Sequence, residues 1–481
     1  DLEQIGISLQ TAGAFSSRGS GGEPPADFVS KFVGHSAEIA FYGSDAERSV
    51  SCMKIAIAGG GIGGMALALS LVAAGLDDVD IFESAAAIRE LGVGINVLPH
   101  GVRELAELGL LDELLTVGIP TSEFIYYSRH GQRIWGEPLG VAAGYRWPQV
   151  SIHRGELLGI LYRAVVDRLG AHRVHTAHHL AVFGQEYRGV WAEFSNRDSG
   201  SAVARVDADL LVGCDGIHSS VRSTLYPDEG LPRWNGVVMW RGLTLGDPFL
   251  SGRTMINVGS SRQRVVVYPV SSAEEDRGRA LINWVATLHT GAAEDMPPQD
   301  WTFLAQREDV LKPFASFVFD FLDVAALIRG TETIYQYPMT DRDPLPSWVS
   351  GHVTLLGDAA HPMHPVGGNG ASQAIIDARV LARELAMQPT VEAAIAAYDA
   401  ARRPPTASVV QSNRRAGPHR CQDLVEERAP NGFADLSEVI SQQELDDIAL
   451  DYKRTAGFDV DGLNQRRSFS VKAGGRVASC P

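Results

Sequence analysis

A glycine-rich turn between a strand and a helix restricts the fold of this chain more than any other feature. Residues 54–59 read KIAIAG, a run typical of a buried parallel strand, and residues 59–64 read GGGIGG. Residues 62–74 have helical spacing, and residues 79–83 (VDIFE) form the next expected strand. The sequence therefore predicts a βαβ unit of the kind that opens a parallel sheet.

The glycine spacing GxGxxG predicts that this unit binds a dinucleotide. Glycines allow the tight turn, the approach of the backbone to a pyrophosphate and the packing of the helix on the strand. The start of the helix offers free N–H groups to the phosphates. An acid at the end of the second strand can accept hydrogen bonds from ribose hydroxyls. The residues expected to hold the dinucleotide are Gly59, Gly61, Gly64 and Glu83, and this motif alone does not separate NAD from FAD.

Two further turns follow buried strands later in the chain. Asp215 and Gly216 come after the strand expected at residues 209–212, and Asp358 comes after residues 353–356. Aspartate can accept a hydrogen bond from a sugar-like hydroxyl. After Asp358, a glycine-rich loop leads into a helix from about residue 371, and such a loop can lie against a flat ring. The residues of this loop are Pro365, Gly367, Gly368, Asn369 and Gly370.

The middle of the chain predicts a second layer. Residues 264–270, 281–287 and 333–339 are short, β-branched and aromatic, which favours an antiparallel sheet. The fold class is therefore α/β (α+β overall), a Rossmann-like domain with an inserted antiparallel-sheet domain and C-terminal helices. The expected boundaries are 1–52 for a poorly ordered extension, 53–130, 151–232 and 347–419 for the nucleotide domain, 131–150 and 233–346 for the sheet domain, and 420–481 for C-terminal helices and tail.

The sequence also predicts where the folded unit begins and how the C-terminal helices end. Met53 is expected to begin the folded unit. The Ala-rich helix from residue 391 is expected to end near Pro404, since proline disfavours a helix interior. Residues 436–452 have helical spacing, and residues 455–481 are expected to form a frayed tail.

Composition excludes several classes of function. The net charge of −16 argues against general nucleic-acid binding, and no apolar run approaches the length of a membrane helix. The four cysteines form no CxxC pair, and the N-terminus has no secretory pattern, so a reducing cytoplasm is expected. Four histidines at a helix-to-strand junction, His172, His175, His178 and His179, are expected on a solvated loop and strand edge, and no metal site is predicted.

The ordered set of GxGxxG, the Asp-Gly turn and the Gly-Asp turn resembles the single-component FAD-dependent aromatic hydroxylases (group A flavoprotein monooxygenases). The resemblance spans residues 53–403, and the set is specific although each motif alone is not. Further segments resemble the phenazine-type branch of that family. They are residues 91–96 (LGVGIN), 151–157 (SIHRGEL), 239–242 (MWRG), 336–339 (QYPM) and 341–346 (DRDPLP).

This resemblance implies a cofactor, a reaction and roles for several residues. The cofactor is FAD, the co-substrates are O₂ and NADH or NADPH, and a planar, acidic aromatic substrate is hydroxylated through a flavin C4a-hydroperoxide. Because the flavin carries the chemistry, no catalytic side chain is predicted. Arg103 would reach the flavin side of the pyrophosphate, Arg154 would approach FAD, and Asp215 and Gly216 would serve both FAD and NAD(P)H. Asp358 would bind the sugar-like chain of the flavin.

The 365–370 loop would flank the isoalloxazine, and it departs from the family pattern at one position. Many relatives read Gly-Gln-Gly where this chain reads Gly368-Asn369-Gly370, so the position of the ring can differ.

The substrate side of the site is predicted from four residues on the expected sheet, Trp240, Arg241, Tyr268 and Tyr337. Aromatic residues of a sheet more often belong to a core than to a pocket, so both interpretations of Trp240 stay open. A flavin halogenase would carry a Trp-x-Trp-x-x-Pro segment and a disulfide reductase a CxxC pair, and this sequence has neither. A non-catalytic or oxidase-type flavoprotein is the remaining alternative.

Overall fold

A six-stranded sheet contains the βαβ unit expected from the glycine turn. The computed structural model describes residues 53–88, 92–187, 189–291 and 303–471, so the expected extension at 1–52 lies outside the described residues. The strands lie in the order β20 (Val349–Ser350), β21 (Val353–Leu355), β12 (Leu210–Gly213), β1 (Ile55–Ala58), β2 (Val79–Phe82) and β8 (Val174–His175). All neighbours are parallel except the edge strand β20.

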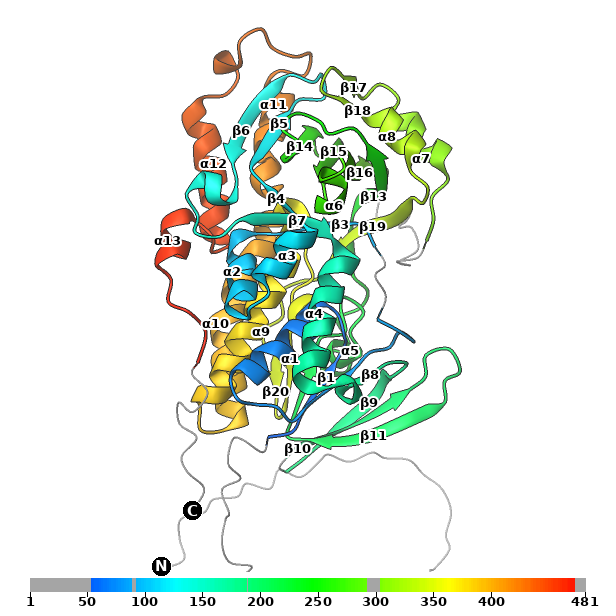
Figure 1. Ribbon diagram of the computed structural model, residues 1–481, viewed down its shortest axis with the longest axis vertical. Helices are drawn as coiled ribbons and strands as arrows, with labels where there is room; N and C mark the ends of the chain where they lie inside the picture. The colour runs from blue at the N-terminus through cyan, green and yellow to red at the C-terminus, as the bar shows by residue number, and fades with distance from the viewer. Residues whose placement is uncertain (1–52, 89–91, 188, 292–302, 472–481) are drawn as a thin grey trace, which may run out of the picture. The chain divides into compact units, whose positions relative to one another are not determined.

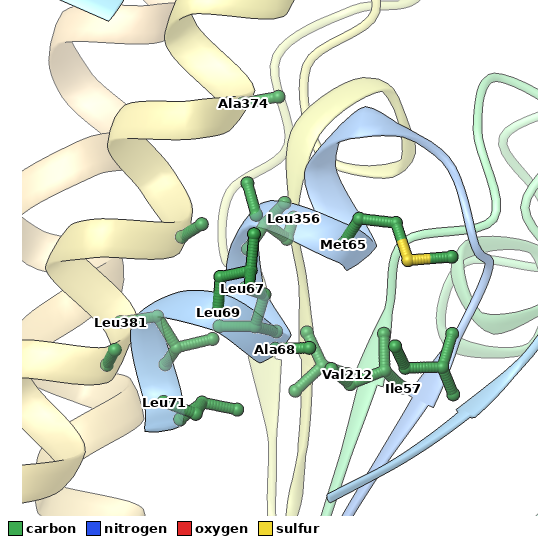
Figure 2. Close-up of a cluster of buried hydrophobic side chains, with 14 of the residues drawn as sticks. Ile57, Met65, Leu67, Ala68, Leu69, Leu71, Val212, Leu356, Ala374 and Leu381 are labelled. Atoms are coloured by element: carbon green, nitrogen blue, oxygen red, sulfur yellow. The ribbon is translucent and has the colours of Figure 1, made fainter. Parts of the chain in front are cut away.

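Helices cover this sheet because its central strands are buried on both faces. Helix α1 (Ile62–Ala73) packs against α9 (Gly370–Met387) and α4 (Arg154–Leu169), and α9 packs in turn against α10 (Val391–Arg414). Figure 2 shows α1 between the strands and α9, with Ala68 beside Val212 and Leu381 reaching toward α1. The apolar side chains of β1, β12 and α1 belong to one core, and the turns at the ends of these strands are therefore firmly placed.

A seven-stranded sheet confirms the predicted antiparallel layer. Its strands lie in the order β19 (Tyr335–Asp341), β13 (Arg233–Gly246), β16 (Ala280–His289), β15 (Gln263–Pro269), β14 (Thr254–Gly259), β5 (Glu123–Tyr127) and β6 (Arg133–Pro138). All pairs are antiparallel except β14 with β5. Strand β5 precedes residue 131, so this sheet begins earlier in the chain than expected, because pairing with β14 recruits it.

The two faces of the seven-stranded sheet are covered by different helices. One face packs against α7 (Arg307–Phe314) and α8 (Val324–Gly330), and the other packs against α11 (Arg420–Arg428) and α12 (Gln442–Thr455). Figure 1 shows these two pairs of helices on opposite sides of the sheet. The face toward α11 and α12 carries Tyr126 and Tyr268, whereas Trp240 and Trp284 lie on the other.

The remaining elements are short. Three-stranded sheets are formed by β3 (Gly94–Val97), β7 (Gln149–His153) and β4 (Ile119–Thr121), and by β11 (Ala202–Ala208), β10 (Gly189–Ser195) and β9 (His179–Glu186). A small hairpin joins β17 (Val318–Phe319) and β18 (Leu322–Asp323). The other helices are α2 (Pro99–Glu107), α3 (Leu111–Val117), α5 (Ser220–Leu225), α6 (Ser272–Glu275) and α13 (Val460–Gln465).

Two predictions about the C-terminal part were wrong. Helix α10 does not end near Pro404 but continues through Pro404 and Pro405 to Arg414, since its packing against α9 holds it in place. The expected frayed tail contains α13, and residues as far as Ser470 pack against α2 and α9. Within the part of the chain that the structure describes, no helix has the length and hydropathy needed to cross a bilayer.

Candidate functional site

The glycine turn between β1 and α1 faces open space at the position where a phosphate would approach. A Cβ atom at Gly59, where φ is 110°, would overlap the Cys214 carbonyl oxygen, and one at Gly64 would overlap the Gly59 carbonyl oxygen. At Gly61, in contrast, nothing lies within 4 Å of the Cβ position. Helix α1 begins without a side-chain cap, so its first N–H groups are available to an anion.

Glu83 lies beside this turn, at the end of β2. Its Oε2 accepts a hydrogen bond from the Gly60 amide at 2.7 Å, and its Oε1 accepts one from the Ala85 amide at 2.7 Å. A carboxylate has about four acceptor positions, so further hydroxyls can still bind to it. The structure thus brings Glu83 together with the glycine turn, as the sequence predicts.

Asp215 and Gly216 follow β12, which pairs directly with β1. The Asp215 Oδ2 accepts hydrogen bonds from the amides of Ser220 and Val221 at 2.7 and 3.3 Å, and it thereby caps α5. Its Oδ1 is buried without a hydrogen-bond partner among the described residues, and burial raises the pKa of this carboxyl. Gly216 has a φ of 78° and open space at its Cβ position. The free carboxylate oxygen and the open backbone are suited to a polar ligand.

Asp358 and Arg154 are accessible residues with much of the protein around them. Both side chains are exposed, yet desolvation by the surrounding protein raises the pKa of Asp358 and lowers the pKa of Arg154. After desolvation, the electrostatic influences on Arg154 come from the charges of Arg241, Asp358 and Glu83 and from the Tyr337 phenol. Arg154 therefore stands between the nucleotide residues and the seven-stranded sheet.

The 365–370 loop follows the Asp358 turn and ends where α9 begins. Gly367 and Gly368 have φ values of 69° and 65°, which favour glycine, and Pro365 is exposed. The Asn369 side chain is buried, and its Nδ2 donates a hydrogen bond to the Tyr452 hydroxyl at 3.0 Å. The departure from Gly-Gln-Gly thus has a local explanation, since Asn369 anchors the loop to the protein beneath it.

A buried polar network below this loop was missed by the sequence analysis. Asp377 accepts hydrogen bonds from Arg402 Nε at 2.6 Å and from the Gly357 amide at 3.2 Å, and its Oδ2 lies 2.5 Å from His361 Nε2. Burial alone would raise the pKa of Asp377, but the charges and hydrogen bonds of His361 and Arg402 lower it. Arg402 also donates to Gln373 at 2.6 Å. In the sequence, this network is indicated only by two polar residues, Gln373 and Asp377, spaced i, i+4 on an otherwise apolar helix.

Arg103 does not lie with the other predicted residues. It is buried on α2, where its Nη1 and Nη2 donate to the carbonyl oxygens of Leu463 and Arg466 at 3.3 and 2.8 Å. Its Nε pairs with Glu107 at 3.4 Å. All three nitrogens are therefore engaged by α2 and the C-terminal segment, and we do not retain Arg103 as a pyrophosphate contact.

Three of the four predicted substrate residues share one face of the seven-stranded sheet. Arg241 Nη2 and the Tyr268 hydroxyl both donate to the Gly94 carbonyl oxygen, at 2.5 and 3.1 Å. Tyr337 lies on the same face and interacts electrostatically with Arg154. Trp240 points to the other face, where it packs near Phe314 and donates to Gln336 at 2.8 Å. The geometry groups Arg241, Tyr268 and Tyr337 and places Trp240 in a core.

The family to which this arrangement belongs is shown by comparison with known proteins. A model of the FAD binding domain family matches residues 52–413, which is most of the chain. The chain belongs to this family. Phenazine 1,6-dicarboxylic acid hydroxylase PhzS of Lysobacter antibioticus is 47% identical over 363 residues, covering 75% of this chain and 89% of that protein. Salicylate hydroxylase of Pseudomonas putida is 30% identical over 82% of this chain and 90% of its own length.

Solved structures of this FAD-binding family have the same fold. Klebsiella pneumoniae HpxO, in complex with FAD and uric acid, superposes with a TM-score of 0.66 at 26% identity, over 84% of this chain and 97% of that one. The cofactor of the present protein is FAD, and its residues fit that molecule. The open backbone at Gly61 suits the pyrophosphate, and the accessible Asp358 and Arg154 suit the polar chain of the flavin.

Proposed function

We propose that this protein is an FAD-dependent monooxygenase that uses NADH or NADPH and O₂ to hydroxylate a planar aromatic or heteroaromatic acid. The observation that carries the proposal is the position of Arg154. It interacts electrostatically with Asp358, which follows β21, and with Arg241 and Tyr337 of the seven-stranded sheet. A flavin held by Asp358 and Arg154 would present its ring to the sheet. We place the reaction in the cytoplasm, because the cysteine pattern fits a reducing compartment.

The side chains of this protein bind and orient, and bound FAD supplies the transfer of two electrons from the nicotinamide and the activation of O₂. Glu83 and the glycine turn would hold the adenosine half, and Asp358 would accept hydrogen bonds from the hydroxyls of the flavin chain. The 365–370 loop and the start of α9 would place free N–H groups beside the ring. In the overall reaction one oxygen atom of O₂ enters the substrate and the other leaves as water.

The arginine pair supports an acidic substrate. Desolvation and Arg241 lower the pKa of Arg154, and the buried Arg241 Nε has no hydrogen-bond partner among the described residues. Two neighbouring cations create a local positive potential in a chain whose net charge is −16. A carboxylate beside them would relieve their mutual repulsion. The dicarboxylic substrate named for the Lysobacter relative has this chemistry, and we propose a phenazine-carboxylate-like acid.

The test is substrate-stimulated oxidation of NADH and NADPH by the FAD-loaded chain. The panel contains benzoates, phenazine carboxylic acids and the neutral methyl ester of each acid, and product masses are measured alongside. We expect acids to stimulate oxidation more strongly than their esters and to gain one oxygen atom. Stimulated oxidation that yields only hydrogen peroxide would favour an oxidase-type flavoprotein. Bound FAD without stimulation by any compound would contradict the proposed class of substrate.

A further inference from the structure

The segment that follows the matched family region packs against the 365–370 loop. The family model ends at residue 413, and α12 and α13 come after it (red-orange to red in Figure 1). Gln373, at the start of α9, donates to the Ala456 carbonyl oxygen at 3.0 Å. The His100 ring stacks on Phe458 with centroids 5.0 Å apart. These contacts place the end of α12 directly beneath the loop.

Tyr452 of α12 makes the central contact. Its hydroxyl accepts a hydrogen bond from Asn369 Nδ2 at 3.0 Å and lies 3.0 Å from two acceptors, the Val366 carbonyl oxygen and Asn413 Oδ1. Asn413 in turn donates to the His364 carbonyl oxygen at 2.9 Å. One buried hydroxyl thus ties together both ends of the segment from Val366 to Asn369.

The backbone between these two ends is shaped around the Tyr452 ring. Gly367 and Gly368 are both in the left-handed region, and a Cβ atom at Gly367 would overlap the Tyr452 hydroxyl. Burial raises the pKa of Tyr452, so the hydroxyl keeps its proton and remains a donor. The conformation of the loop and the position of this phenol therefore depend on each other.

The contact extends to the Asp358 turn through buried side chains. Asn369 Oδ1 accepts a hydrogen bond from Gln373 at 3.3 Å, and Gln373 Oε1 accepts one from Arg402 at 2.6 Å. Arg402 pairs with Asp377, which holds the Gly357 amide next to Asp358. The network therefore joins the two turns that are expected to contact the flavin.

Helix α12 is itself firmly held at this point. Lys453, the residue after Tyr452, pairs with the half-buried Glu137 of β6 at 2.5 Å. The Tyr452 ring belongs to a small apolar cluster with Tyr145, Phe458 and Leu463. A hydroxyl on such a fixed support can hold a loop in one conformation.

We propose that Tyr452 is a positioning residue for FAD: its hydroxyl fixes the 365–370 loop in the conformation that receives the isoalloxazine ring. It acts through Asn369 and Val366 and does not touch the flavin itself. The inference rests on the placement of the flavin ring in the proposed function. Its test needs no turnover, so a failure of hydroxylation and a failure of this inference remain distinguishable.

The test compares Tyr452→Phe with Tyr145→Phe in the full-length chain. Both substitutions remove a buried phenol hydroxyl from the same apolar cluster. Among the described residues, the Tyr145 hydroxyl donates to the Phe458 carbonyl oxygen at 2.6 Å. We measure the Kd of FAD by flavin fluorescence, the visible absorption and circular dichroism of the bound flavin, and the melting temperature of both apoproteins.

We expect Tyr452→Phe to weaken FAD binding about tenfold, because the loop loses the hydroxyl that accepts from Asn369 Nδ2 and donates toward Val366 and Asn413. The spectrum of the bound flavin should also shift. Tyr145→Phe should lower the melting temperature of the apoprotein about as much as Tyr452→Phe does. It should leave the FAD affinity and the flavin spectrum unchanged.

A double-mutant cycle with Asn369→Ala tests whether Tyr452 acts on FAD binding through Asn369. If Tyr452 acts through Asn369, the two effects on FAD affinity should not add. Unchanged FAD affinity and spectrum in Tyr452→Phe, with only a lower melting temperature, would overturn the proposal and leave a purely structural residue. Equal losses of FAD affinity in Tyr452→Phe and Tyr145→Phe would overturn it as well.

Discussion

Two aspartates, 19 positions apart, show how differently single residues can contribute to this site. Desolvation raises the pKa of Asp358, whose charge therefore destabilises the apoprotein. Asp377 is also desolvated, but His361 and Arg402 lower its pKa, and its charge stabilises the fold. At neutral pH we expect Asp358→Asn to raise the melting temperature of the apoprotein and weaken FAD binding about tenfold or more. Asp377→Asn should lower the melting temperature.

The two variants form a matched pair, since each replaces a carboxylate by an amide of nearly equal volume. The measurement is thermal unfolding of the apoproteins at pH 7, with FAD titrated by fluorescence. A raised carboxyl pKa means that the charged form is disfavoured in the fold, and a lowered pKa means that it is favoured. Melting shifts of the same sign in both variants would contradict this assignment.

At the scale of elements, the segment after α12 is held to α2 by charges. Arg466 Nη2 lies 2.5 Å from Glu104 Oε1, and the Glu104 side chain is fully buried. Burial raises the pKa of Glu104, and Arg466 opposes this rise. In Arg466→Met, the Glu104 carboxylate would keep only its longer ion pair with Arg379, at 3.4 Å. We expect the free energy of unfolding to fall by about 3 kcal/mol.

Two measurements test whether this ion pair holds the segment after α12. Urea unfolding gives the loss of stability, and limited proteolysis reports on residues 456–471, which should become more accessible. Adding Glu104→Gln to Arg466→Met should recover part of the loss, because a neutral amide is cheaper to bury than an unpaired carboxylate. A double variant less stable than Arg466→Met alone would show that the ion pair does not hold the segment.

Across the whole molecule, the features that could be predicted from the sequence are those that depend on a short, continuous stretch of residues. The strand, the glycine turn and the helix at residues 54–74 were confirmed, because local spacing specifies the turn. The antiparallel sheet was also confirmed, although the membership of β5 depends on its pairing with β14. The hydrogen bonds between Asn369 and Tyr452 and between Arg103 and Arg466 join residues far apart in the chain. Neither could be predicted, since both depend on how the C-terminal segment packs.

The same packing makes the whole apoprotein sensitive to acid. His100, His364 and His419 are buried, and desolvation lowers the pKa of each, that of His100 from 6.5 to about 3. Between these two values the unfolded chain binds a proton at His100 that the folded chain does not bind. His100 therefore contributes full stability above pH 6.5, and as the pH falls through this window stability is lost at up to about 1.4 kcal/mol per pH unit.

We expect His100→Gln to make the unfolding free energy less dependent on pH between pH 6.5 and 3. The slope should fall by up to the amount that the uptake of one proton contributes. His289→Gln, at an exposed position, is the control and should leave the slope as it is. Urea unfolding of the apoproteins at successive pH values gives the slope directly. The comparison of slopes, rather than of stabilities, separates proton uptake from the loss of the stacking contact with Phe458, since that loss is the same at every pH. Identical slopes for wild type and His100→Gln would mean that His100 is protonated inside the fold, and that the interior next to the 365–370 loop tolerates a charge.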